Sequence, residues 1–350
     1  MKKILAIALC LCMVLGIAAC SKEPAAAAEK TYKLGMGIVV SMDSSKTDNA
    51  QVDATVATVV LDEAGKIVAC RIDVAQNKMN IKDGAVDTAK TFKTKMEQGT
   101  EYGMAGKVDN DGNGVMLEWD AQAKAFEAYV VGMTVAQVEA IQTKEANGHQ
   151  IAVDQKLLDA GCSMQITDFI AAVAAACKDE QGMSFKTAAT FTLGVAAKTT
   201  AADSVAATAD KDGTVAMYSD FAATVIADGK ILAALNDAIQ PKITINTKGE
   251  IVKTAYTATK RELKEDYNMA TKGKNMDNDG DGRVLEWYVQ SEAFSKFVVG
   301  KTGAEVAAMQ TKTLENGYKI SADEALLNAG CTIQITGICA VVAQAATNAR

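Results

Sequence analysis

Two acidic, glycine-containing loops carry the residue types that most directly suggest chemistry. Asp109-Asn110-Asp111-Gly112-Asn113-Gly114 recurs as Asp277-Asn278-Asp279-Gly280-Asp281-Gly282. Oxygen-bearing side chains at alternate positions before a glycine also open the calcium-binding loop of an EF-hand. The acid that closes such a loop at its twelfth place is present as Asp120 in the first copy, but Tyr288 replaces it in the second. We therefore expect either a calcium site or a solvated turn, since Asn and Asp beside Gly are common turn formers. The candidate ligands are Asp109, Asp111, Asn113, Asp277, Asp279 and Asp281.

A second sequence motif also occurs twice in the chain. Leu158-Asp159-Ala160-Gly161-Cys162-Ser163-Met164-Gln165-Ile166-Thr167 returns as Leu327-Asn328-Ala329-Gly330-Cys331-Thr332-Ile333-Gln334-Ile335-Thr336. The offset is 169 positions (331 minus 162), which is far longer than the roughly 20 to 50 residues of a solenoid repeat. This spacing predicts a duplicated domain and two equivalent sites.

The chain as a whole has room for two such domains. It has 350 residues, 49% of them apolar, and a formal net charge of -7. At roughly 100 to 200 residues per domain, this length predicts two units, each with its own core. The acidic balance and the absence of a basic patch argue against a nucleic-acid partner. With His149 as the only histidine, a His-based catalytic or metal site repeated in both copies is excluded.

The N-terminus has the form of a bacterial lipoprotein signal. Lys2 and Lys3 precede the apolar stretch Ile4 to Ala19, and small residues then lead directly to Cys20. We expect Cys20 to carry lipid and to hold the protein at the outer face of the cell membrane; an ordinary secretory signal is the alternative. The predicted organisation is a signal peptide at 1–20, a tether at 21–30, a first repeat at 31–180 and a second repeat at 181–350.

The patterning between the motifs predicts an α+β fold of two tandem related domains. In each copy, β-rich runs flank an acidic turn, at Asp62-Glu63-Ala64-Gly65-Lys66 and again at Asp228-Gly229-Lys230, which is a hairpin signal. Helices are expected to follow, beginning near Trp119 and Trp287 and ending with alanine-rich tails at 169–177 and 338–346. The two tryptophans fit either a helix core or a surface that stacks on an aromatic ligand. Each domain is therefore expected to place antiparallel hairpins first and helices after.

This order of elements resembles the flavin mononucleotide (FMN)-binding domain of exported bacterial electron-transfer proteins. Some of these are flavin subunits of membrane complexes, and one is a lipoprotein with two such domains. In that family a Ser-Gly-Ala-Thr motif carries FMN on its threonine, and here the motif reads Ala160-Gly161-Cys162-Ser163 and Ala329-Gly330-Cys331-Thr332. The resemblance implies FMN at Thr332 and Ser163 beside Gly161 and Gly330, and a redox partner in the membrane. Leu157 and Leu326 stand where the family has an acid.

The sequence thus leaves two main functions open. One is a flavin-carrying electron carrier, in which the cofactor supplies the chemistry. The other is a non-catalytic surface protein for binding or structure, stabilised by calcium, in which the flavin site has been lost and both hydroxyl motifs merely turn the chain into the last helix. The five cysteines beyond the signal show no metal-ligand spacing and are expected to pack in the core.

Overall fold

The computed structural model of the chain describes residues 28–107, 109–270, 277–315 and 317–350. The predicted signal sequence and the lipidation site Cys20 lie outside the described residues. Within them the fold is α+β with antiparallel sheets, as the sequence predicts. None of the helices in this part of the chain is long and apolar enough to cross a membrane.

The first large sheet forms from the first copy of the sequence and one later strand. Its order is β3-β2-β1-β6, with every neighbouring pair antiparallel. The predicted turn between β2 and β3 is held by Asp62, whose Oδ1 accepts hydrogen bonds from the backbone N–H groups of Ala64 and Lys66. The strands are β1 (Lys30–Ser41), β2 (Asn49–Leu61), β3 (Ile67–Asn80) and β6 (Met183–Thr187). Strand β6 pairs with β1 although it lies beyond the predicted boundary at residue 180.

The second copy builds two further sheets. One has the order β10-β9-β7, and a smaller one has the order β12-β11-β8. The strands are β7 (Thr192–Thr200), β8 (Gly213–Val215), β9 (Tyr218–Ala227), β10 (Lys230–Ile239), β11 (Lys242–Ile245) and β12 (Ile251–Ala255). The hairpin predicted around Asp228 and Gly229 is therefore present as β9–β10.

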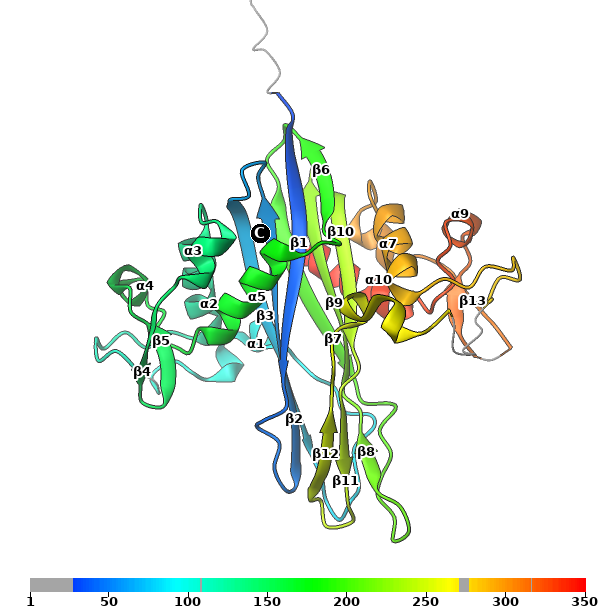
Figure 1. Cartoon of the computed structure of the whole chain (residues 1–350), viewed down its shortest axis with the longest axis horizontal. Coiled ribbons are helices and arrows are strands. Elements are labelled where there is room, and N and C mark those ends of the chain that lie inside the picture. Colours follow the sequence, from blue (N-terminus) through cyan, green and yellow to red (C-terminus); the bar gives the residue numbers. More distant parts are fainter. Residues whose placement is uncertain (1–27, 108, 271–276, 316) are drawn as a thin grey trace, which may run out of the picture.

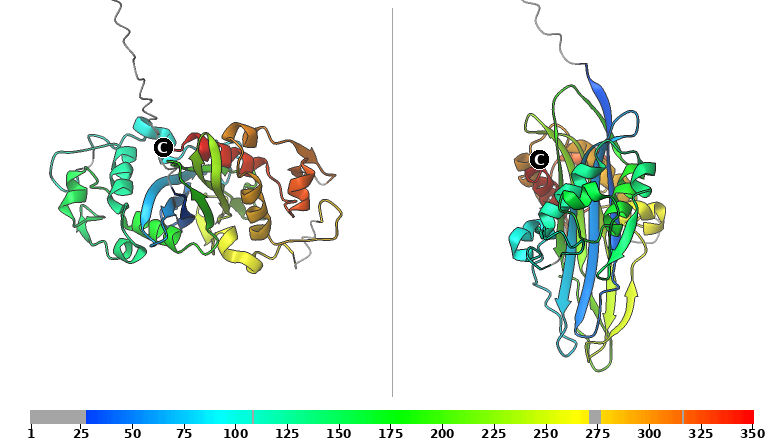
Figure 2. Two further views of the ribbon diagram at one scale, coloured as in Figure 1. Left: turned by 90° about the horizontal axis from the view of Figure 1, so that it is seen from above. Right: turned by 90° about the vertical axis from the view of Figure 1, so that its left-hand side faces the viewer.

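The two large sheets pack together over one apolar core. Alternating residues put Leu34 and Val56 of the first copy in the same buried cluster as Val195 and Phe221 of the second. The other faces of the sheets are covered by helices on opposite sides of the molecule (Figures 1 and 2). The copies thus share their central core, and each adds a smaller core under its own helices.

Two long helices in each copy cover the sheets. They are α2 (Trp119–Val130) and α5 (Thr167–Lys178) in the first copy, and α7 (Trp287–Phe297) and α10 (Thr336–Thr347) in the second. Gly35 and Gly37 on β1 let α5 lie close to the sheet, because a Cβ at either position would fall within 2.5 Å of a backbone atom of α5. Gly194 on β7 does the same for α10.

The remaining elements are short. They are α1 (Lys95–Gln98), η1 (Gly99–Tyr102), α3 (Val135–Glu139), β4 (Thr143–Ala146), β5 (His149–Ala152), α4 (Gln155–Asp159), α6 (Lys260–Leu263), η2 (Lys264–Tyr267), α8 (Gly303–Ala307), β13 (Thr311–Thr313), β14 (Lys319–Ser321) and α9 (Glu324–Asn328). The hairpins β4–β5 and β13–β14 interrupt the helical part of each copy and were not expected from the sequence.

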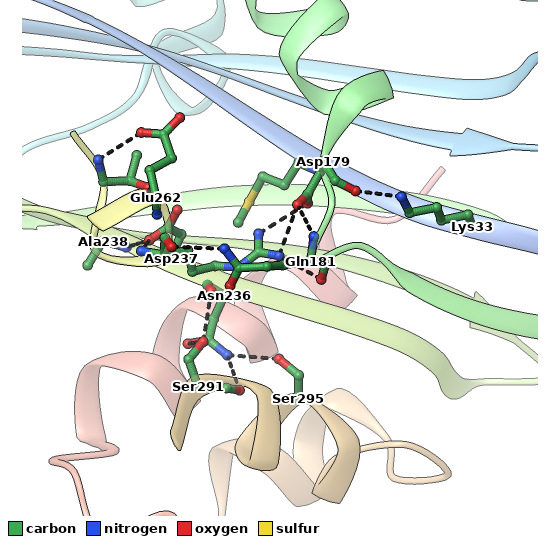
Figure 3. A network of polar contacts seen from close by, with 12 residues as sticks. Lys33, Asp179, Gln181, Asn236, Asp237, Ala238, Glu262, Ser291 and Ser295 are labelled. Carbon is green, nitrogen blue, oxygen red and sulfur yellow. Dashed lines mark hydrogen bonds and ion pairs between the residues drawn. The ribbon is translucent and has the colours of Figure 1, made fainter. Parts of the chain in front are cut away.

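A buried ion pair ties the two copies together (Figure 3). The guanidinium of Arg261, on α6, lies 3.2 Å from the carboxylate of Asp179, which follows α5. Both side chains are less than 10% exposed. Asp179 also accepts hydrogen bonds from the backbone N–H groups of Met36 and Gln181, so its charge is held from both copies.

Replacing Arg261 with Met, the residue at the matching position 96 of the first copy, should lower the free energy of unfolding by about 3–5 kcal/mol. The variant leaves the buried Asp179 carboxylate without its cation. Urea unfolding measures the effect. The control is Lys264→Met, which removes the exposed partner of Glu180 and should cost no more than about 1 kcal/mol. Equal losses in the two variants would show that the buried pair has no special role.

Candidate functional site

Two equivalent pockets, one in each copy, lie beside the starts of α5 and α10. The first has a volume of about 260 Å³ and the second about 310 Å³. Each is lined by a lysine, a tryptophan, the glutamine of the repeated motif and the second residue of the last helix. These matching residues are Lys95, Trp119, Gln165 and Asp168 in the first pocket, and Lys260, Trp287, Gln334 and Gly337 in the second.

The lysine of each pocket lies over two aromatic rings. The Nζ of Lys260 is 5.2 Å from the ring centroids of both Tyr267 and Trp287. In the first copy, Lys95 makes the same contacts with Tyr102 and Trp119, at 4.9 and 5.6 Å. A cation within about 6 Å of an aromatic face is attracted by the ring quadrupole. The tryptophans are buried as core residues, and they also form pocket walls.

A short capped helix places each lysine. Thr94 and Glu97 form a reciprocal capping box around α1, and Thr259 and Glu262 form the same box around α6. The helix is then anchored by a buried aspartate on the sheet. Asp237 accepts hydrogen bonds from the backbone N–H groups of Arg261 and Ala238. Asp73 binds Met96 and Val74 in the same way.

Each pocket contains a carboxylate near its lysine, but the two carboxylates come from different elements. In the first copy it is Asp168, on α5, and in the second it is Asp220, on β9. A side chain at Gly337, which corresponds to Asp168, would place its Cβ 2.4 Å from Asp220 Oδ2. Burial raises the pKa of Asp220 while Lys260 opposes that rise, and burial lowers the pKa of Lys260.

The repeated hydroxyl residues do not line the pockets; they are buried within the protein, one or two residues before motif residues that do. Ser163 and Thr332 are 1% and 5% exposed. A buried glutamine holds each backbone: Gln290 Oε1 accepts from the Thr332 N–H at 2.8 Å and from its hydroxyl at 3.2 Å. Gln122 Oε1 likewise accepts from the Ser163 N–H at 3.0 Å, whereas the Ser163 hydroxyl is buried without a hydrogen-bond partner.

The backbone conformation explains why the repeated motif has glycine at positions 161 and 330. Gly161 and Gly330 follow α4 and α9 with φ angles of 87° and 91°, a left-handed conformation that favours glycine. Their N–H groups bond the carbonyls of Leu158 and Leu327, closing the two helices. These glycines therefore set the direction in which the chain enters the motif.

The residues present fit the ring of an FMN better than its phosphate. Aromatic walls, a cation and a glutamine amide suit a polar fused-ring system, and the orphaned Ser163 hydroxyl lacks a partner inside the protein. At 260–310 Å³ the pockets lie at the small end of the usual range for ligand sites. Any remaining part of a flavin has to extend out of them.

The acidic loops are connected to the same motif. Asn110 donates from Nδ2 to the Ser163 carbonyl at 2.9 Å, and Asn278 donates to the Thr332 carbonyl at 2.8 Å. Asp109 and Asp277 bond backbone N–H groups of their own loops, as turn-forming acids do. The loops therefore position the motif whether or not they bind an ion.

The carboxylates of the second loop converge. One oxygen from each of Asp277, Asp279 and Asp281 lies within 4.8 Å of the others, and Asp281 also pairs with Arg283. The middle acid of each loop, Asp111 or Asp279, has one buried oxygen without a hydrogen-bond partner. In the first loop, burial and the neighbouring Asp109 carboxylate, which can accept a hydrogen bond from protonated Asp111, raise the pKa of Asp111. Oxygen ligands arranged in this way suit a hard cation.

The cysteines of the described chain are free thiols packed in the interior. Burial raises the pKa of Cys162 and of Cys331 to about 12. Such thiols are protonated at neutral pH and are poor nucleophiles. The sequence-based expectation of core packing is met by Cys70, Cys162, Cys331 and Cys339, while Cys177 is partly exposed.

Several residues of the site were missed from the sequence. The spacing of Gln122 and Gln290, 168 positions (290 minus 122), matches that of Trp119 and Trp287, so their recurrence was a usable signal. Lys95 and Lys260 recur in the matching segments Thr94-Lys95-Met96-Glu97 and Thr259-Lys260-Arg261-Glu262, so their recurrence was a second usable signal. Asp220 could not be found in this way, because Thr55 stands at the corresponding strand position of the first copy.

Comparison with known proteins gives one redox-related similarity. The chain is 30% identical to a chlorophenol reductase of Desulfitobacterium hafniense over 157 residues, which is 39% of this chain and 46% of that protein. The chain thus spans less than half the length of this relative. No family model matches the sequence, and no solved structure matches it.

The buried aspartates predict a pH dependence of stability. Burial raises the pKa of Asp73 and of Asp237 to about 6, above the usual 3.8. The folded state therefore holds more protons than the unfolded state between about pH 4 and 6. The contribution of these two carboxyl groups to the free energy of unfolding falls as the pH rises through this range. Relative to wild type, Asp237→Asn should gain stability between pH 4.5 and pH 8, by about 2 kcal/mol.

Urea unfolding at the two pH values measures this gain. Glu63→Gln, in the exposed turn between β2 and β3, is the control and should show little change between them. A gain for Asp237→Asn that is independent of pH would mean that the buried carboxyl keeps an ordinary pKa.

Proposed function

We propose that this protein is an electron carrier that holds a flavin-type cofactor in its two equivalent pockets. The observation that carries the proposal is the duplicated lysine over tyrosine and tryptophan, directly beside the repeated hydroxyl motif. The partial similarity to a reductase supports a redox role. The lipid anchor at Cys20, the position outside the cell membrane and a redox partner in the membrane belong to the same proposal.

When bound, a flavin supplies electron transfer, and the chain supplies binding and orientation. Trp119 and Trp287 provide flat apolar walls, while Lys95 and Lys260 place a positive charge at the ring edge. Gln165 and Gln334 offer amides that can donate to ring carbonyl oxygens or accept from a ring N–H. Thr332 and Ser163 belong to the motif that resembles the family's attachment site, but both are buried, so attachment of a phosphate at either requires its hydroxyl to become exposed.

The proposal predicts the stoichiometry of flavin binding. Titration of the mature protein with FMN, followed by quenching of flavin fluorescence, should give two sites. Lys95→Met and Lys260→Met should each reduce the count to one, because the loss of a charge-assisted contact weakens binding at least about tenfold. Lys264→Met changes an exposed lysine outside both pockets and should retain two sites.

Covalent attachment has a separate readout. Protein co-expressed with a flavin-transferring enzyme should gain mass that disappears with Thr332→Ala. Bare polypeptide mass together with normal FMN titration would limit the proposal to non-covalent binding. Bare mass with no FMN binding by the wild-type protein would remove the redox proposal.

A second candidate function is calcium-dependent stabilisation of a surface-binding protein. It is favoured by the convergence of Asp277, Asp279 and Asp281 and by the buried, unpartnered oxygens of Asp111 and Asp279. Calcium bound there would stiffen the loops whose asparagines hold Ser163 and Thr332.

Calcium should therefore raise the melting temperature of the protein. At one hundred times its dissociation constant, one bound ion adds about 2.7 kcal/mol to the free energy of unfolding. Asp279→Asn should remove the response of the second loop, and Asp111→Asn that of the first. Asn113→Asp, which gives the first loop the three acids of the second, should increase its affinity. Identical melting curves with calcium and with a chelator would identify both loops as solvated turns.

A further inference from the structure

A larger cleft in the second copy lies apart from the two pockets. It has a volume of about 790 Å³ and is bordered by β6, β10 and α7. Its apolar lining comes from the strand residues Met183, Phe185, Leu232 and Leu235 and from Val299 after α7. The size falls within the range of small-molecule sites, about 300–1,000 Å³.

The cleft opens where two strands from different sheets approach each other without pairing. Strand β6 is the last strand of the first sheet and β10 is the last strand of the second. Leu235 and Phe185 belong to the core shared by the two sheets, so the cleft leads from the surface to the edge of that core. An apolar ligand there would cover Met183 and Leu232, which are partly exposed at the edge of that core.

The matching cleft of the first copy shows what distinguishes this one. It has a volume of about 750 Å³, but Arg71, Glu127 and Arg350 form a charged cluster along it. In the second copy the positions of Arg71 and Glu127 are taken by Leu235 and Ser295. The charge cluster is therefore replaced by an apolar side chain and a small hydroxyl.

Most polar groups of the second cleft are hydrogen-bonded or ion-paired within the protein, whereas Ser184 and Lys186 of β6 are exposed to solvent. Arg261 is paired with Asp179, and Lys296 lies 2.5 Å from Glu292. Tyr288 donates to Glu265, and Ser291 donates to Asn236. Ser295 accepts a hydrogen bond from Asn236 Nδ2 at 3.0 Å, which leaves its own proton available to an acceptor (Figure 3).

We propose that this cleft binds an uncharged aromatic molecule that bears a hydrogen-bond acceptor, such as a quinone carbonyl. Phe185 and the leucines provide apolar contact, and Ser295 donates to the acceptor. An uncharged ligand is favoured because the lining is largely apolar and Arg261, Lys296 and Glu292 are already paired, while Lys186 is exposed to solvent. The site is separate from the proposed flavin pockets and does not depend on them.

The test uses the neutral probe N-phenyl-1-naphthylamine, which fluoresces in apolar surroundings. We expect one site per chain on the mature protein. Val299→Trp should fill the mouth of the cleft and weaken binding at least tenfold, whereas Val131→Trp, at the matching position of the first copy, should leave it unchanged. Both valines are exposed, at 43% and 47%, so both variants should fold; thermal unfolding checks this.

Competition between unlabelled ligands and the probe then tests the proposed hydrogen bond from Ser295. Menadione, a quinone, should displace the probe more strongly than 2-methylnaphthalene, which lacks an acceptor, and Ser295→Ala should reduce this preference about fivefold. Absence of probe binding, or equal losses in Val299→Trp and Val131→Trp, would overturn the proposal. An unchanged preference in Ser295→Ala would overturn the assigned role of that hydroxyl. Lys260→Met should leave probe binding intact, and this separates the cleft from the flavin pockets.

Discussion

The packing of two sheets over one shared apolar core is the constraint on which the rest of the structure depends. Because Leu34 and Val56 share a cluster with Val195 and Phe221, each copy buries one face of its sheet against the other copy. Only the outer faces are left for helices, and this fixes α2 and α5 on one side and α7 and α10 on the other. The pocket and the cleft of each copy then lie where its sheet meets its helices.

Within that frame, buried polar groups determine where the pocket residues stand. Asp73 and Asp237 are desolvated on the sheets, and each anchors the backbone of a one-turn helix that carries the pocket lysine. Gln122 and Gln290 do the same for the motif before the last helix. A buried polar group that loses its partner is costly, so these contacts hold the pocket walls in one arrangement.

The sequence predicted the repeated elements well because they follow local rules. The β-rich runs around acidic turns predicted the hairpins β2–β3 and β9–β10, and the helical pattern beginning near Trp119 predicted α2. The small hairpins β4–β5 and β13–β14 were missed because they are short and largely exposed, without a marked apolar alternation. The shared core could not be foreseen either, since apolar periodicity shows that a face is buried and does not show what covers it.

The site residues could be predicted only where the same functional group occupies the matching position in both copies. Ser163, Thr332 and the acidic loops were found by recurrence, whereas the pocket carboxylate moved from α5 to β9 and left no repeated signal. Glycine at position 337 accompanies this difference, because a side chain there would collide with Asp220. The two copies differ in the same way at the clefts, where a charged cluster surrounds Glu127 in the first copy and an apolar lining lies beside Ser295 in the second.

This pattern of change has a physical consequence for the two copies. Asp220, which approaches Lys260 from the sheet, is more desolvated than Asp168, which is exposed on α5, so the opposite charges of the second pocket interact in a less polar setting. Coulomb interactions strengthen as the surrounding dielectric falls. Two ligands of the same kind would therefore experience different fields in the two pockets. For a redox cofactor, this difference would separate the potentials of the two sites and give electron flow between them a direction.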